Sequence, residues 1–205
     1  MEEKAEISIK GKSSEKCLNL LLAAMLTFFL IYLGRPLVQG DWTEAVDYVA
    51  FYSAGKIINE GEYEDIYDLK ILEGLERDIL TSIDGQVVMD FEVIAILYLP
   101  VFIWPFSLLA RLNFPSSSLV WLGVNVLFLI GYLWFFAKKT SGQAPSLQLL
   151  LIFLTSFPVL QNFYYGQVNV WLVICLGEFL RTSLSKKPYL AGLWLGGLLI
   201  KPHLL

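Results

Sequence analysis

The residues best able to do chemistry are polar side chains that lie in or beside apolar stretches. They are Asp47, Asp68, Asp90, Tyr98 with Pro100, the pair Gln167 and Asn169, and Lys201. Burying polar groups in a membrane is costly, so such residues are functional candidates by default. Each also has an ordinary structural explanation. Asp68 can cap a helix, and Lys201 can extend to the lipid headgroups. The amide pair can join helices through hydrogen bonds.

Several common catalytic signatures are absent from the sequence. We find no P-loop, no dinucleotide-binding glycine fingerprint, no metal-spaced histidines and no nucleophile elbow. His203, the single histidine, is best interpreted as a packed or hydrogen-bonded residue, and Cys17 and Cys175 as packing residues in apolar surroundings. We therefore expect no cofactor and no metal site, although Asp90 could bind a metal if other loops supplied ligands.

The composition predicts a helical membrane protein. Of 205 residues, 56% are hydrophobic and 17% are charged, whereas soluble domains have roughly 25% charged residues. The uncharged stretches are residues 17–34, 93–110, 112–137, 140–177 and 188–200. A crossing needs about 20 mostly apolar residues, so the first three suit one crossing each and the fourth, broken near 158–166, suits two short ones. Because Leu205 falls inside an apolar pattern, we expect the domain at 17–205 to be truncated.

Charge indicates the orientation of the chain. Four lysines precede the first apolar stretch, so residues 1–16 are predicted to be a cytoplasmic tail before a retained signal-anchor helix. Residues 34–90 then form a long outer loop of a multi-pass plasma-membrane protein. This loop holds thirteen of the nineteen acidic residues, and the net charge is −4. The membrane bilayer is thus a partner, whereas nucleic acid is not.

Two helices are predicted within the outer loop. The first begins near Asp41 and Glu44, a capping pair, and ends at Gly61. Its apolar positions recur at helical spacing and suggest an amphipathic helix on the membrane interface, with Asp47 at the edge of the stripe formed by Tyr48, Phe51, Tyr52, Gly55 and Ile58. A second amphipathic helix should place Ile71, Leu75 and Ile79 on one side.

The path of the chain after the loop has two solutions. Simple alternation of crossings puts the basic groups at 138–139 and 181–187 outside, which the positive-inside rule disfavours. If residues 93–110 instead dip in and return, broken at Pro100 and Pro105, those groups move inside. The second path also puts Gly166 to Asn169 on the same side as the loop.

The order of short motifs resembles glycosyltransferase family 87, the polyprenyl-phosphate-mannose-dependent mannosyltransferases. The motifs are DYVAFYSAG at 47–55, GEYEDIYD at 61–68, LYLPVFIWPF at 97–106, FYYGQVNV at 163–170 and AGLWLGGLLIKP at 191–202. The likeness extends from about residue 20 to the end. Two positions depart from it: Val101 stands where the family often has a second proline, and His203 follows the Lys-Pro pair.

The resemblance implies an all-α transmembrane bundle of GT-C type that transfers a hexose, with mannose expected, from a polyprenyl-phosphate donor to a lipid or glycan acceptor. Asp47 matches the catalytic carboxylate, which would act as the general base of an inverting transfer. The positions matching substrate-binding residues are Tyr52, Tyr67, Asp68, Tyr98, Gln167, Asn169 and Lys201. Two alternatives remain: a polytopic transporter or flippase, and a non-catalytic subunit that binds lipid carriers.

Overall fold

The chain is helical throughout the part described by a computed structural model, residues 2–39, 46–84 and 93–201. The elements are α1 (Glu2–Gln39), α2 (Val46–Glu60), η1 (Tyr63–Tyr67), α3 (Leu69–Asp84), α4 (Pro100–Ile103), α5 (Phe106–Leu109), α6 (Phe114–Ser141), α7 (Leu147–Leu154), α8 (Phe157–Tyr164), α9 (Asn169–Leu184), α10 (Pro188–Gly197) and η2 (Leu198–Ile200). No strand occurs in these ranges. The predicted all-α class is confirmed.

Two helices are long and apolar enough to cross a membrane. They are the Lys16–Arg35 part of α1 and the whole of α6. Helices α7 and α8 form a third candidate if the pair, bent by 58°, is counted as one span. The predicted break of the fourth apolar stretch is thus a kink between α7 and α8, followed by a turn before α9.

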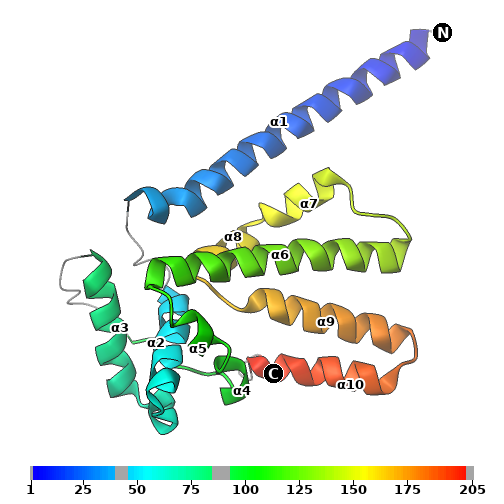
Figure 1. The fold of residues 1–205 in the computed structure, drawn as a ribbon. Helices are drawn as coiled ribbons and strands as arrows, with labels where there is room; N and C mark the ends of the chain where they lie inside the picture. The colour runs from blue at the N-terminus through cyan, green and yellow to red at the C-terminus, as the bar shows by residue number, and fades with distance from the viewer. Residues whose placement is uncertain (1, 40–45, 85–92, 202–205) are drawn as a thin grey trace.

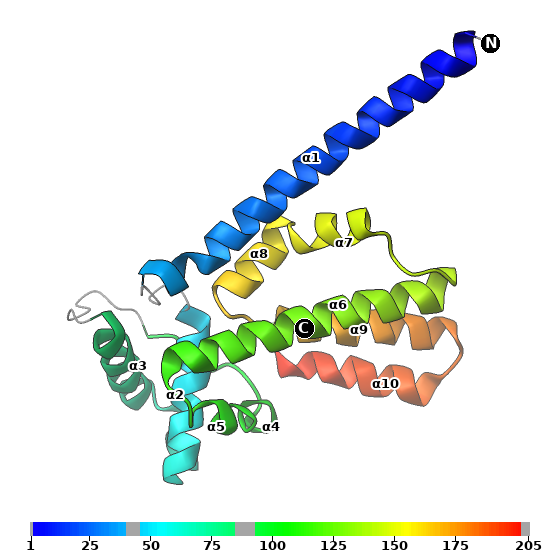
Figure 2. The ribbon, with the colours of Figure 1, turned by 45° about the horizontal axis from the view of Figure 1, so that its top comes forward.

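The helical bundle has two ends, and different elements gather at each (Figures 1 and 2). Helices α6, α9 and α10 lie side by side, and the α6–α7 and α9–α10 connections lie at the end nearer the N-terminus. Helices α2 to α5 gather at the opposite end, together with the first turns of α6 and α9 and the last turn of α10. Residues far apart in sequence therefore meet at the α2 end of the bundle.

The segment 93–110 does not form one crossing helix, so the expectation of a crossing there is wrong. It contains two four-residue helices, α4 and α5, which are separated by Trp104 and Pro105. Proline lacks an N–H and clashes with the preceding turn, which explains the break. Both short helices contact α2, and the chain stays at that end of the bundle. The segment returns to the end from which it came, as the second predicted path requires, and the basic last turns of α6 and α9 lie at the same end as the start of α1.

Helix α2 is buried on nearly all sides. Residues 48–54 are each at most 3% exposed, because α3, α5 and α6 cover the helix. Aromatic rings enclose it: Phe51 stacks on Phe106 with ring centroids 4.7 Å apart. The predicted stop at Gly61, where φ is +85°, is confirmed. The expected exposed face of an amphipathic surface helix is wrong, because other helices cover α2. The proposed capping pair at Asp41 and Glu44 lies outside the described residues.

Helix α3 is amphipathic, as predicted, and Ile79 and Leu75 of the predicted face pack in the core, but the buried face is rotated away from Ile71. Leu72, Glu76 and Leu80 are nearly inaccessible, whereas Ile71 is 38% exposed. The fully buried Glu76 accepts a hydrogen bond from the backbone of Ile94 at 3.1 Å. This hydrogen bond and the burial of Leu72 determine which face of α3 packs against the rest of the molecule. The spacing of hydrophobic residues alone did not predict that face.

Candidate functional site

The first turn of α2 is joined to the turn between α8 and α9. The backbone N–H of Tyr48 donates to the carbonyl of Tyr165 at 3.2 Å. The indole N–H of Trp121 on α6 donates to the carbonyl of Gly166 at 2.8 Å. Gly166 has φ +70°, and a Cβ there would lie 2.5 Å from the Cβ of Tyr48. Only glycine suits both the backbone conformation and the close approach. The Asp47 turn is therefore held beside the Gly166–Asn169 motif.

A polar cluster follows directly from that turn. The side-chain amide of Asn169 donates to Gln167 Oε1 at 2.6 Å, and Lys201 Nζ donates to Asn169 Oδ1 at 3.4 Å. Asn162 Oδ1 accepts from the backbone N–H of Asn169 at 2.9 Å, so it holds the start of α9 in place. Three residues predicted from separate motifs, Gln167, Asn169 and Lys201, are thus in contact.

Asp47 occupies the first turn of α2 and is half-buried. No hydrogen bond or ion pair to its carboxylate occurs among the residues that the structure describes. Tyr98 lies close enough to Asp47 to interact with its charge. Burial raises the pKa of the Tyr98 phenol, and the charge of Asp47 raises this pKa further. The ring of Tyr98 packs edge-on against Phe51, with centroids 4.8 Å apart. Within the described ranges, no side chain or backbone group thus occupies the oxygens of this carboxylate.

The remaining predicted residues make structural contacts. Tyr52 donates its hydroxyl to the carbonyl of Leu112 at 2.7 Å. Asp68 caps α3, because its Oδ1 accepts from the backbone N–H of Lys70 at 2.8 Å. Tyr67 donates its hydroxyl to the carbonyl of Tyr98 at 2.8 Å and so ties η1 to the segment that carries Tyr98. Tyr67 thus supports the Asp47 neighbourhood indirectly, whereas the contacts of Tyr52 and Asp68 lie elsewhere.

An apolar groove begins at the Tyr67–Tyr98 hydrogen bond. It has a volume of about 390 Å³ and runs between η1 and α4, lined by Ile58, Tyr63, Ile66, Tyr67, Pro100, Val101 and Trp104. Tyr63, Val101 and Trp104 are strongly exposed. The groove is therefore open to a long apolar ligand that reaches it from the surface.

Metal binding finds no support in the described ranges. They contain no group of three or more histidine, cysteine, aspartate or glutamate side chains placed to hold an ion. Asp90 and His203 lie outside the described residues. Among the described residues, the predicted groups that meet at the α2 end are a carboxylate, an ammonium group and amides.

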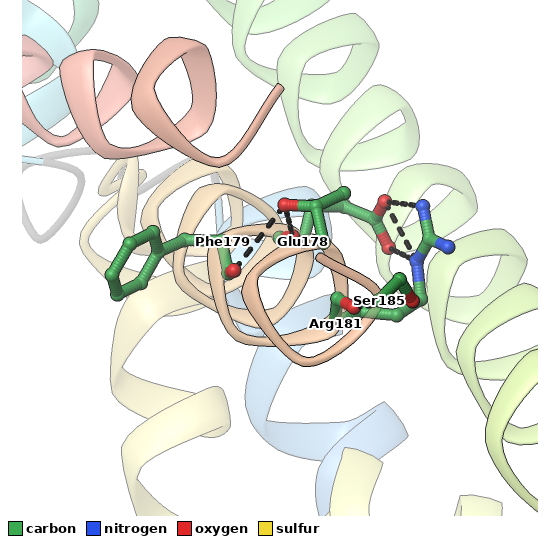
Figure 3. Close-up of polar contacts among 5 residues, drawn as sticks. Glu178, Phe179, Arg181 and Ser185 are labelled. Atoms are coloured by element: carbon green, nitrogen blue, oxygen red, sulfur yellow. Dashed lines mark hydrogen bonds and ion pairs between the residues drawn. The ribbon is translucent and has the colours of Figure 1, made fainter. Parts of the chain in front are cut away.

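Helix α9 carries a charged pair that was not predicted from the sequence (Figure 3). The guanidinium of Arg181 faces the carboxylate of Glu178, with Nε at 2.9 and 3.0 Å from the two carboxylate oxygens and Nη2 at 2.5 Å from Oε2. The Glu178 side chain is 6% exposed. Their i, i+3 spacing was the available signal. The pair lies in the C-terminal half of α9, away from the end that holds Asp47.

Comparison with known families identifies the class of protein. The family model for glycosyltransferase family 87 matches residues 97–204, more than half of the chain. The chain therefore belongs to glycosyltransferase family 87, a family of membrane glycosyltransferases. No curated protein and no solved structure matches it. Tyr98, Gln167, Asn169 and Lys201 fall inside the matched region, whereas Asp47, Tyr52, Tyr67 and Asp68 precede it.

Proposed function

We propose that this protein transfers a hexose, specifically mannose, from a polyprenyl-phosphate donor to a lipid or glycan acceptor at the outer face of the plasma membrane. In this proposal Asp47 is the general base. The observation that carries it is the joining of the Asp47 turn to the turn before Gln167, next to the cluster of Asn169 and Lys201. A carboxylate and an ammonium group thus lie at one end of the bundle, which supports these two roles.

The chemistry requires one base and one anion site. The acceptor hydroxyl attacks the anomeric carbon while Asp47 takes its proton. The bond from that carbon to the donor phosphate oxygen breaks with inversion, and the phosphate leaves with the electron pair. Lys201, oriented by Asn169, would stabilise the departing phosphate, with Gln167 contributing its amide group.

Two further features support a lipid-linked donor on the outer face. The basic last turns of α6 and α9 share an end with the N-terminus, which the positive-inside rule assigns to the cytoplasm. The opposite end, with Asp47, would then face outward. The apolar groove beside Tyr67 and Tyr98 suits an isoprenoid chain, since its exposed aromatic residues are typical of the membrane interface.

The test is the variant Asp47→Asn in the full-length protein, assayed for mannose transfer from radiolabelled polyprenyl phosphate mannose. Loss of a general base should reduce turnover about 10²–10⁴-fold while donor binding is retained. Asp78→Asn, the same change at an exposed position of α3, is the matched control and should keep its activity. Unchanged transfer by Asp47→Asn would exclude this mechanism. Movement of intact labelled lipid between leaflets, without transfer, would favour a flippase.

A further inference from the structure

A second cavity lies at the α2 end of the bundle. It has a volume of about 660 Å³ and lies between α2, the last turns of α3 and the connection from α5 to α6. Its polar lining consists of Tyr52, Lys56, Ser82, Arg111 and Asn113. This volume is in the range of roughly 300–1,000 Å³ that is usual for small-molecule sites. The cavity is large enough for a ligand of its own.

Two cations at this cavity have no carboxylate partner among the described residues. Lys56 is half-buried, with Nζ 5.4 Å from the centroid of the Tyr52 ring, and Arg111 is exposed. By contrast, Arg77 and Arg181 both form ion pairs. Acidic residues dominate the 34–90 segment, yet none of the described ones pairs with Lys56 or Arg111. The two cations therefore give the cavity a positive charge that would attract an anion.

The other polar groups at the cavity are already satisfied. Tyr52 donates to Leu112, and the Ser82 hydroxyl donates to the carbonyl of Ile79 at 2.7 Å. Asn113 caps α6 by accepting from the backbone N–H of Ser116 at 2.9 Å. The start of this 28-residue helix adds partial positive charge to the same cavity. Recognition would therefore rest on positive charge, which selects an anion.

The cavity is separate from the proposed transfer site. Lys56 follows Asp47 by nine residues on α2, which is two and a half helical turns. The two side chains consequently point to opposite sides of the helix and are about 14 Å apart along its axis. Asp47 adjoins Tyr98, whereas Lys56 faces the α5–α6 connection. A ligand held by Lys56 would not occupy the position of the donor.

We propose that this cavity binds a phosphate group through Lys56 and Arg111. The guanidinium of Arg111 can donate hydrogen bonds to two phosphate oxygens at once, and the ammonium group of Lys56, on α2, adds a second positive charge. Helix α6 is long and apolar enough to cross a membrane, and a crossing by α6 would put the cavity, at its N-terminal end, near the membrane surface. A phosphate that arrives there belongs either to a lipid headgroup or to free inorganic phosphate.

Binding to the purified full-length protein in detergent tests the proposal. The probes are dioctanoyl phosphatidylglycerol, inorganic phosphate and dioctanoylglycerol, which lacks the phosphate. Lys56→Gln and Arg111→Gln should each weaken phosphatidylglycerol binding about tenfold, the loss of one charged hydrogen bond. Arg111→Lys, which keeps the charge, should recover part of it. Lys70→Gln, which removes a lysine outside the cavity, should bind like the wild type.

The outcomes distinguish the source of the phosphate. Tight binding of phosphatidylglycerol with weak binding of inorganic phosphate would assign a lipid headgroup, and equal affinities would assign free phosphate. Dioctanoylglycerol binding as tightly as phosphatidylglycerol would overturn the proposal, because the phosphate would then contribute nothing. Wild-type affinity in both Lys56→Gln and Arg111→Gln would overturn it as well. None of these measurements depends on glycosyl transfer.

Discussion

Replacing Glu76 by glutamine should change how the stability of this protein depends on pH. Glu76 is fully buried on α3. Burial raises the pKa of its carboxyl from 4.5 to about 7, although the N–H donated by Ile94 acts in the opposite direction. The second carboxylate oxygen has no partner among the described residues. The ionised form is thus poorly compensated in the folded protein.

The sign and size of the effect follow from the two pKa values. Between pH 4.5 and about 7 the folded protein binds more protons at Glu76 than the unfolded chain does. The contribution of Glu76 to stability is therefore largest below pH 4.5 and is lost as the pH rises through 7. The total is about 3 kcal/mol, of which about 2.5 kcal/mol falls between pH 5 and pH 8. At 2–4 °C per kcal/mol, this corresponds to about 5–10 °C in Tm.

The assay is thermal unfolding of the detergent-solubilised protein from pH 5 to pH 8, followed by tryptophan fluorescence. Glu76→Gln keeps an oxygen for Ile94 but cannot ionise, so its Tm should fall less than that of the wild type as the pH rises. Glu64→Gln, the same change at an exposed position, should follow the wild type. Parallel Tm curves for the wild type and Glu76→Gln would refute the reasoning.

Further variants test three other parts of the structure. Gly166→Ala should destabilise the protein by about 2 kcal/mol, because a Cβ meets Tyr48 at a positive φ; a Tm equal to that of the wild type would contradict this. Arg181→Gln leaves Glu178 buried without its partner and should cost about 3 kcal/mol. Replacing Glu178 by leucine and Arg181 by methionine in one protein should restore most of the lost Tm, because no buried charge then remains unpaired. Lys201→Gln should reduce mannose transfer about 10²-fold if its charge stabilises the leaving phosphate, whereas Lys201→Arg should retain more activity.

Hydropathy alone was enough to predict the long helices, because an apolar stretch of about 20 residues can satisfy its backbone in lipid only as a helix. The span in α1 and helix α6 were predicted for this reason. Length alone failed at 93–110, where Pro105 breaks the helix and α2 provides the packing surface for both short pieces. The prolines in this segment indicated that a break was possible. Only the contacts of α4 and α5 with α2 show that the segment turns back at the α2 end of the bundle.

The polar cluster was partly predictable from motif order. Gln167, Asn169 and Lys201 were all named from the sequence, and the structure brings them into contact. Asn162 carries the same signal, a lone amide in an apolar stretch, and was overlooked. The burial of Glu76 could not be predicted, since its position on α3 resembles that of exposed residues until the helix docks on α2.

The neighbourhood of Asp47 is assembled from segments that share no local sequence signal. Tyr98 lies near Asp47 because two hydrogen bonds hold the residues before α4. The backbone N–H of Ile94 donates to Glu76, and the carbonyl of Tyr98 accepts from the hydroxyl of Tyr67. The turn at Gly166 is held beside Asp47 by the backbone hydrogen bond from Tyr48 to Tyr165, two residues more than one hundred positions apart. The carboxylate takes part in none of these bonds, so the described residues position Asp47 without using its hydrogen-bonding capacity. That is the arrangement expected of a residue whose partner is a substrate.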